Sequence, residues 1–279
     1  MLDQVTITVL CENRVAKPDL IAEQGLSLHI STMEGNFLFD TGCKDTFLLN
    51  AEKLGIDLSQ IKYIFLSHGH RDHTGGLRAY LEKCGPASVV CHYTVFNRKF
   101  RVINGGRLEV GIPYEEGELT RMGAQFTFKS SPFNLSRNVI SSGEIPRITE
   151  FETPLDVHQE LVLESYLTDE MNDDMSLILK TRRGLVILLG DAHRGVINTV
   201  QHAIKVTGVE KVYAIMGGMN LQYADRERIE QTAEALKAFR PEYLIPLHST
   251  GFYALYHFYS VFRDRVLLLN TGDRFVITG

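Results

Sequence analysis

Four side chains that can bind a metal ion lie within six positions, in segment 68–73 with the sequence HGHRDH. His68 and His70 leave the end of an apolar segment two positions apart, so in extended backbone both rings face the same way. Asp72 and His73 come at the turn into a helix, where they can face a second point nearby. Imidazole and carboxylate groups suit zinc, iron or manganese, and two ions can share such a loop. The segment therefore predicts one or two divalent metal ions, rather than exposed histidines on a polar loop.

The elements that position this segment alternate between strands and helices. Apolar segment 61–66 predicts a buried strand that runs directly into the metal-binding residues. The other elements expected in this half of the chain are strands at 5–10, 26–32, 36–39 and 87–91, and helices at 47–54 and 74–84.

The second half of the chain has a loosely similar order of elements. Periodicity predicts strands at 161–167, 175–181, 185–189, 212–216, 243–246, 266–269 and 275–277, and helices at 196–206, 226–238 and 251–262. Residues from about 95 to 160 predict irregular hairpins and long loops, which often border functional sites. No linker or repeated unit divides the chain, so we expect a single domain over 1–279.

The composition is that of an ordinary globular protein. The chain has 279 residues, of which 44% are hydrophobic, and its apolar runs are too short to cross a membrane. No signal-peptide pattern begins the chain, and Cys11, Cys43, Cys84 and Cys91 form no CxxC pair, so we expect a cytoplasmic protein with free thiols. A net charge of −5 without a basic stripe argues against a nucleic-acid partner. A homo-oligomer remains compatible with these features.

The metal-binding segment, preceded about thirty residues earlier by Phe39-Asp40-Thr41-Gly42, resembles the metallo-β-lactamase superfamily. One branch of it is named for 7,8-dihydropterin-6-methyl-4-(β-D-ribofuranosyl)aminobenzene-5'-phosphate synthase of methanopterin biosynthesis. Segments similar to that branch are 142–147 (SGEIPR), 173–177 (DDMSL), 190–198 (GDAHRGVIN), 217–221 (GGMNL) and 246–251 (PLHSTG). The resemblance implies an α/β (α+β) fold, the αββα sandwich of two mixed β-sheets flanked by helices.

The resemblance also implies roles for the metal-binding side chains. His68 and His70 would hold a first metal, Asp72 and His73 a second, Asp191 would bridge the two, and His248 would be the last ligand. Asp191 follows an apolar run, where an unpaired carboxylate is costly to bury. The third histidine of the first site has no obvious counterpart between residues 74 and 190, where His92 and His158 lie outside the branch motifs, and we choose His193, two residues after Asp191. Asp40 would steady a ligand from outside the centre, or serve as a turn residue.

This centre predicts a hydrolase. A bound metal lowers the pKa of water to about 7, and the hydroxide attacks an ester, lactone or phosphoester, with Asp72 or Asp191 taking a proton. Asn220 stands where the branch commonly has histidine; it can hydrogen-bond the substrate, or form a turn, but is a poor metal ligand. Three arginines lie in or beside site motifs and could bind a phosphate or carboxylate of a small anionic substrate, or be ordinary surface residues: Arg71, Arg147 and Arg194.

Two alternatives to a hydrolase stay open. One is the synthase-type reaction of the branch, which condenses a pterin precursor with an aminobenzene ribosyl phosphate. The other is a metal-binding or redox module, with iron as its metal. Zinc heads the candidate metals, followed by iron and manganese. The acidic charge disfavours a nuclease.

Overall fold

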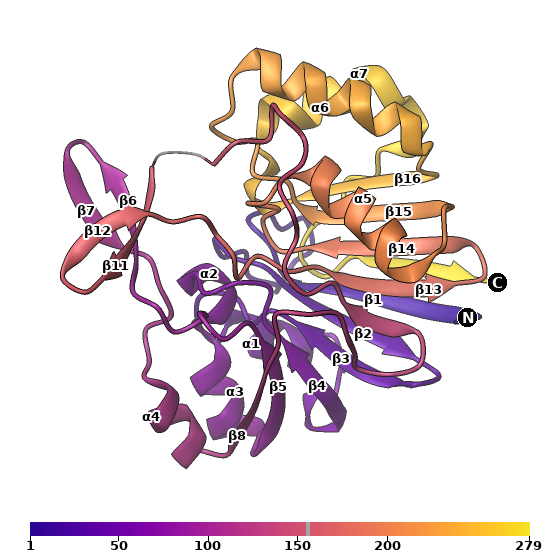
Figure 1. The fold of residues 1–279 in the computed structure, drawn as a ribbon. Coiled ribbons are helices and arrows are strands. Elements are labelled where there is room, and N and C mark those ends of the chain that lie inside the picture. Colours follow the sequence, from indigo (N-terminus) through magenta and orange to yellow (C-terminus); the bar gives the residue numbers. More distant parts are fainter. Residues whose placement is uncertain (155–156) are drawn as a thin grey trace.

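The computed structural model describes residues 1–154 and 157–279, and its largest sheet is built mainly from the N-terminal half of the chain (Figure 1). Strands on one side of this sheet are antiparallel, as hairpins allow, and those from β3 onward are parallel, with helices in the connections. The order of the seven strands is β17 (Arg274–Thr278), β1 (Gln4–Cys11), β2 (Ser27–Thr32), β3 (Gly35–Phe39), β4 (Ile61–Phe65), β5 (Ala87–Cys91) and β8 (Ala124–Phe128).

A second mixed sheet is built from the C-terminal half. Its strands β14, β15 and β16 are parallel, and the others are antiparallel. The order of its six strands is β16 (Tyr243–Leu247), β15 (Val212–Gly218), β14 (Gly184–Leu189), β13 (Leu177–Thr181), β10 (Val139–Ser141) and β9 (Phe133–Asn134).

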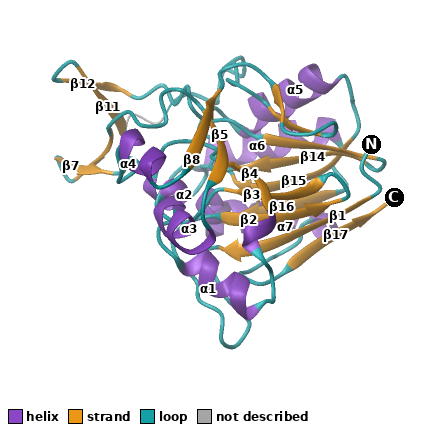
Figure 2. Cartoon of the chain, turned by 90° about the horizontal axis from the view of Figure 1, so that it is seen from below, coloured by secondary structure: helices purple, strands orange, loops and turns teal. Residues whose placement is uncertain are grey.

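The two sheets pack face to face, with helices on both outer sides (Figures 1 and 2). Successive side chains of a strand point to opposite faces of the sheet. Phe65 therefore faces the core between the sheets, whereas its neighbour Ile64 packs under the helices of the first sheet. The helices on this side are α1 (Thr46–Lys53), α2 (Arg71–Thr74), α3 (Leu77–Cys84) and α4 (Glu116–Arg121). Those covering the second sheet are α5 (Val196–Thr207), α6 (Arg226–Phe239) and α7 (Phe252–Phe262). The predicted αββα sandwich is confirmed.

A third sheet of four antiparallel strands projects from one side of the sandwich, at the left of Figure 1. We call it the small sheet; its order is β12 (Ser165–Thr168), β11 (His158–Val162), β6 (Lys99–Ile103) and β7 (Gly106–Glu109). It falls largely in the region that was expected to hold irregular hairpins and loops. That region also contributes α4 and β8, which the weak periodicity did not predict.

Three predicted elements differ from the structure. The helix expected at 74–84 is divided into α2 and α3, because Gly75 and Gly76 lie so close to the backbone of 41–44 that a Cβ would clash. The strand expected at 161–167 is a hairpin whose turn residues Leu163 and Glu164 both have positive φ. Segment 266–269 is no strand, since only Val266 forms a single bridge, to Leu244. No helix in the described part of the chain is long and apolar enough to cross a bilayer.

Candidate metal centre

The predicted metal-binding residues come from loops that follow parallel strands of both large sheets. Segment 68–73 follows β4 in the first sheet, Asp191 and His193 follow β14, and His248 follows β16 in the second. In open sheets with parallel strands, sites form beyond the carboxyl ends of the strands. The packing of the two sheets thus brings together residues that are far apart in the sequence.

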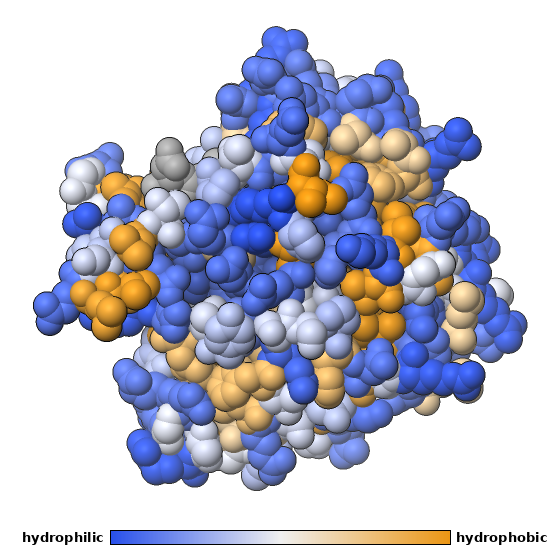
Figure 3. Space-filling model, in the orientation of Figure 1, coloured by the Kyte–Doolittle hydropathy of each residue, from blue (hydrophilic) through white to orange (hydrophobic). Residues whose placement is uncertain are grey.

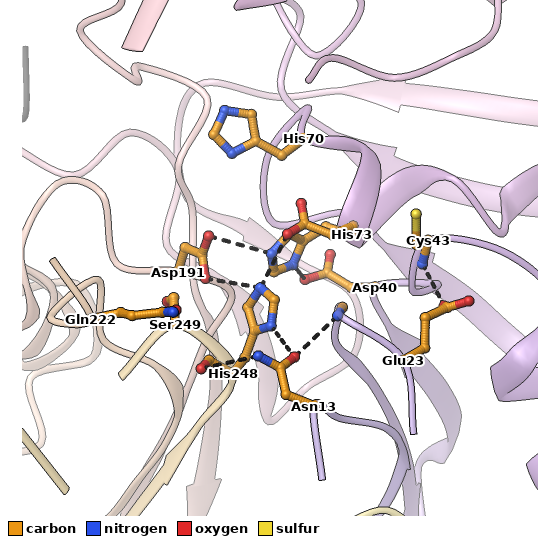
Figure 4. Close-up of polar contacts among 12 residues, drawn as sticks. Asn13, Glu23, Asp40, Cys43, His70, His73, Asp191, Gln222, His248 and Ser249 are labelled. Carbon is orange, nitrogen blue, oxygen red and sulfur yellow. Dashed lines mark hydrogen bonds and ion pairs between the residues drawn. The ribbon is translucent and has the colours of Figure 1, made fainter. Parts of the chain in front are cut away.

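Seven side chains form two adjacent groups whose ligand atoms lie within 4.8 Å of one another in each group. The first group is His68, His70, Asp191 and His193, and the second is Asp72, His73 and His248. Asp191 also faces the second group. Its Oδ1 lies 3.5 Å from His248 Nε2, and its Oδ2 lies 3.5 Å from His73 Nε2 (Figure 4). The same Oδ2 lies 3.3 Å from His193 Nε2.

These side chains fit a metal ion on two grounds. Ligand bonds of about 2.1 Å around a tetrahedral ion place donor atoms about 3.4 Å apart, and Asp191 Oδ2 lies 3.3 Å from His193 Nε2. Moreover, His73 Nε2, His193 Nε2 and Asp191 Oδ1 are buried without a hydrogen-bond partner among the described residues. Buried polar atoms normally have partners, and a cation would satisfy all three.

Hydrogen bonds from outside the two groups orient the rings. Asp40 Oδ2 lies 2.7 Å from His73 Nδ1 and also accepts from Ser67 Oγ, which in turn lies 3.0 Å from His68 Nδ1. Asp40 is fully buried and has a φ of +56°, so a strained turn aims its carboxylate at these partners. Asn13 Oδ1 lies 2.8 Å from His248 Nδ1 (Figure 4). Such contacts fix ring orientation in metal sites, and they place Asp40 where the resemblance implied.

The charges of the centre suit ligation. Burial lowers the pKa of His68 and of His70 well below the ordinary value, so both imidazoles are neutral. Burial alone would raise the pKa of Asp191, but His248 and His73 outweigh it and hold that pKa well below its usual range. Neutral imidazoles and an ionised carboxylate are the forms that bind metals. Asp191 and Asp40 raise the pKa of His73 against the effect of burial, and Asp191 and Asp72 raise that of His248, so these two rings would release a proton when a metal binds.

Comparison with known proteins gives the family. A model of the Metallo-beta-lactamase superfamily matches residues 21–167, which is more than half of the chain. The chain belongs to this superfamily. It is 28% identical to the 7,8-dihydropterin-6-methyl-4-(beta-D-ribofuranosyl)-aminobenzene-5'-phosphate synthase of Methanocaldococcus jannaschii, over 97% of this chain and 96% of the synthase. It is also 29% identical to the uncharacterized protein MJ0448 of that organism, over 89% and 92% of the two chains.

A solved structure agrees with these matches. Tm1679, described as a metal-dependent hydrolase of the beta-lactamase superfamily, is 25% identical and superposes with a TM-score of 0.84 over 99% of this chain and 100% of that one. The resemblance to the metallo-β-lactamase superfamily and to its synthase branch is therefore confirmed.

A buried ion-pair network holds segment 68–73 in place. The sequence did not predict it. Lys99 Nζ is buried and lies 2.7 Å from Asp169 Oδ2 and 3.0 Å from Asp173 Oδ1. The other oxygen of Asp173 accepts a 2.7 Å hydrogen bond from the backbone N–H of Gly69. Asp173 lies in a quoted branch motif, but Lys99 on β6 has no signal in the sequence. The network joins the small sheet to the metal-binding segment.

His158 is a second residue that the motifs missed. Its ring stacks on His70 with 5.2 Å between centroids and meets His193 edge-on at 5.1 Å. Burial lowers the pKa of His158 to about 3, so this ring is neutral as well. His158 comes from β11 of the small sheet, and only the tertiary structure brings it to the centre.

A cavity of about 290 Å³ opens onto both groups of ligands. Arg71 and Asn220 line it, as does Asp72, whose side chain is 25% exposed. Asn220 has a φ of +50° and its backbone N–H donates to Ser249 Oγ, so its position fits the expected turn as well as contact with a substrate.

Arg147 and Arg194 do not lie at the cavity, contrary to the expectation that they bind an anionic group of the substrate. Arg147 donates to the carbonyl oxygens of Glu152 and Glu170, and Arg194 donates to those of Ile145 and Glu170. Neither arginine is among the residues that line the cavity. Both therefore brace loops around the site, and their motif positions reflect the need to satisfy backbone carbonyls.

Proposed function

We propose that this protein is a metal-dependent hydrolase that acts on an ester, lactone or phosphoester of a small anionic molecule. The observation that carries the proposal is the position of Asp191 between the two groups of ligands at the end of one cavity: its Oδ2 lies near both His193 of the first group and His73 of the second, and its Oδ1 lies near His248 of the second. One or two divalent metals held by these side chains would lower the pKa of bound water to about 7 and so would supply hydroxide at neutral pH.

The side chains of this chain have separate roles in the proposed reaction. Asp72 is partly exposed to the cavity and its Oδ2 lies 3.4 Å from His248 Nε2, so it can accept a proton from water and return it to a leaving group. Arg71 and the amide of Asn220 also face the cavity and can donate hydrogen bonds to substrate oxygens. Asp40 and Asn13 act through the rings that they orient.

We favour zinc among the candidate metals, because the donor set combines five imidazoles with two carboxylates at spacings that suit tetrahedral coordination. Iron and manganese suit the same donors. A small molecule rather than a nucleic acid is the proposed partner, since the net charge is −5.

The test is metal reconstitution followed by assays on 4-nitrophenyl acetate, a homoserine lactone and bis(4-nitrophenyl) phosphate. We expect turnover of at least one of the three with one or two metals per chain, and its loss in His73→Ala and Asp72→Ala while circular dichroism stays unchanged. Unchanged turnover in either variant, or a wild-type protein that binds no metal, would contradict the proposal.

The synthase-type reaction is the second candidate. It is supported by the near full-length similarity to the Methanocaldococcus jannaschii synthase. Incubation of the metal-loaded protein with a pterin precursor and an aminobenzene ribosyl phosphate, followed by mass spectrometry, distinguishes the two. A condensed product without ester or lactone hydrolysis favours the synthase.

A further inference from the structure

One face of the small sheet forms a wall of the cavity that holds the candidate metal centre. Leu108 on β7 and His158 on β11 both pair with Arg101 on β6, and Ile103 follows two positions later. Residues that pair across antiparallel strands share a face of the sheet, as do residues two apart in one strand. All four line the cavity.

The position of this wall is set at the root of β6. Lys99 lies two positions before Arg101, is buried, and pairs with Asp169 and Asp173. Because Asp173 also holds the backbone of Gly69, the strand is attached to the metal-binding segment itself. Three side chains therefore follow one another along this face of β6. Lys99 at the start of the strand is neutralised by two carboxylates, Arg101 lies at the cavity, and Ile103 at the end of the strand is exposed.

Arg101 brings a positive charge to the cavity. Its guanidinium lies over the ring of Tyr223, 4.5 Å from the centroid, and Tyr223 follows β15 of the second large sheet. Glu109, which also borders the cavity but pairs with Phe100 on the other face of the small sheet, forms a 2.7 Å ion pair with Arg98, and no carboxylate partner of Arg101 occurs among the described residues. An aromatic ring orients a guanidinium but leaves its N–H donors free to bind an anion.

Apolar side chains flank this charge. Ile103 is 43% exposed and Leu108 is 56% exposed, although both line the cavity. Figure 3 shows hydrophobic side chains among hydrophilic ones on the projecting small sheet, at its left. Exposed aliphatic groups beside a binding cavity offer contact area to a flat, apolar part of a ligand.

We propose that Arg101, held by Tyr223, is a specificity-determining residue that binds a carboxylate or phosphate group of the substrate, while Ile103 and Leu108 contact a flat apolar portion that bears this group. The proposal rests on the proposed function, since it places the reacting bond at the metal centre of the same cavity. A guanidinium binds planar or tetrahedral anions through two parallel hydrogen bonds, which adds both affinity and orientation.

The test compares the binding of benzoate, isophthalate and terephthalate to the zinc-loaded protein by calorimetry. One carboxylate can occupy the metal centre in each case, and the dicarboxylates offer a second one to Arg101 at two spacings. We expect at least one dicarboxylate to bind about tenfold more tightly than benzoate. This preference should disappear in Arg101→Gln and weaken in Tyr223→Leu, whereas Tyr223→Phe keeps it.

Arg107→Gln is the matched control, because Arg107 lies on the same sheet over Tyr166, 4.1 Å from the ring, and does not line the cavity. It should retain the preference, and zinc content should be equal in all variants. A wild-type protein without the preference, or Arg101→Gln that keeps it, overturns the subsite even if esters are hydrolysed. A preference that depends on Arg101 in a protein that hydrolyses none of the test substrates supports the subsite and contradicts the hydrolase.

Discussion

The edge of the two large sheets that carries the candidate metal centre and the face of the small sheet line the same cavity, but they hold their side chains differently. At the edge, His68 and His73 are fully buried and are oriented through Ser67 and Asp40. On the small sheet, Leu108 is 56% exposed and no core packs against it.

This difference teaches how reactivity and selectivity are divided in the molecule. Buried rings with hydrogen bonds on their far side keep a fixed geometry, which metal chemistry requires. An exposed face on a projecting sheet can accept substitutions at little cost in stability. Changes at the edge should therefore abolish activity, and changes on the small sheet should alter which molecule is bound.

The largest effect is expected for Asp191→Asn, which removes the charge shared by the two ligand groups. We expect kcat/KM on the substrate found in the assays above to fall about 1,000-fold and the metal content to fall with it. Mass spectrometry of the metals and steady-state kinetics check this. Asp45→Asn, an exposed aspartate before α1, should change neither quantity; full activity in Asp191→Asn would remove Asp191 from the centre.

The next effect concerns the junction between the two regions. Lys99→Met leaves Asp169 and Asp173 buried without their cation, and loss of one partner of a buried ion pair lowers the free energy of unfolding by about 3–5 kcal/mol. Urea denaturation measures it. Arg98→Met changes the residue just before β6, which forms an exposed pair with Glu109, and should keep the wild-type midpoint. Equal midpoints in the two variants would show that the network does not attach the small sheet.

A smaller effect is expected for Asp40→Asn, which keeps the shape of the side chain but weakens its hold on His73 and Ser67. Loss of such an outer contact lowers metal affinity by about 10- to 100-fold. Competition with a chromophoric chelator gives the value. Asp57→Asn, which alters an exposed turn before β4, serves as the control; an affinity equal to wild type in Asp40→Asn would reduce Asp40 to a turn residue.

The smallest effect is expected for Leu108→Ala on the small sheet. Since the side chain is more than half exposed, the free energy of unfolding should change by less than about 0.5 kcal/mol. The KM for a substrate with a flat apolar portion should nevertheless rise while kcat stays constant. A fall in kcat without a change in KM would place Leu108 in the reaction rather than in binding.

The sequence predicted the sandwich well and the small sheet poorly. Strands such as β4 and β14 are apolar and bounded by turns, and helices such as α6 have a clear apolar face, so local patterns suffice. The strands of the small sheet have no core to cover, and β7 and β12 are exposed along their whole length. Burial on β6 is confined to its first two residues, Lys99 and Phe100, so no strand of the small sheet shows a sustained alternation, which is why 95–160 was expected to be irregular.

The residues of the candidate site likewise fall into some that the sequence predicted and some that it did not. The spacing of His68, His70, Asp72 and His73 was enough to predict metal chemistry, because these ligands are neighbours in the chain as well as in space. The resemblance placed Asp191 and His248 beside them. The choice of His193 among the remaining histidines is matched by its 3.3 Å distance to Asp191, and its role as a ligand stays a prediction.

By itself the sequence determined the cluster of metal-binding side chains and most strands and helices, since short-range spacing and apolar periodicity encode them, and the family resemblance implied how those elements are layered. Only the tertiary structure decided that Lys99 supports the metal-binding segment, that His158 stacks on His70, and that Arg101 rather than Arg147 or Arg194 faces the cavity. These contacts join strands that are distant in the chain, and a side chain that meets its partner across a sheet leaves no periodic mark in its own segment.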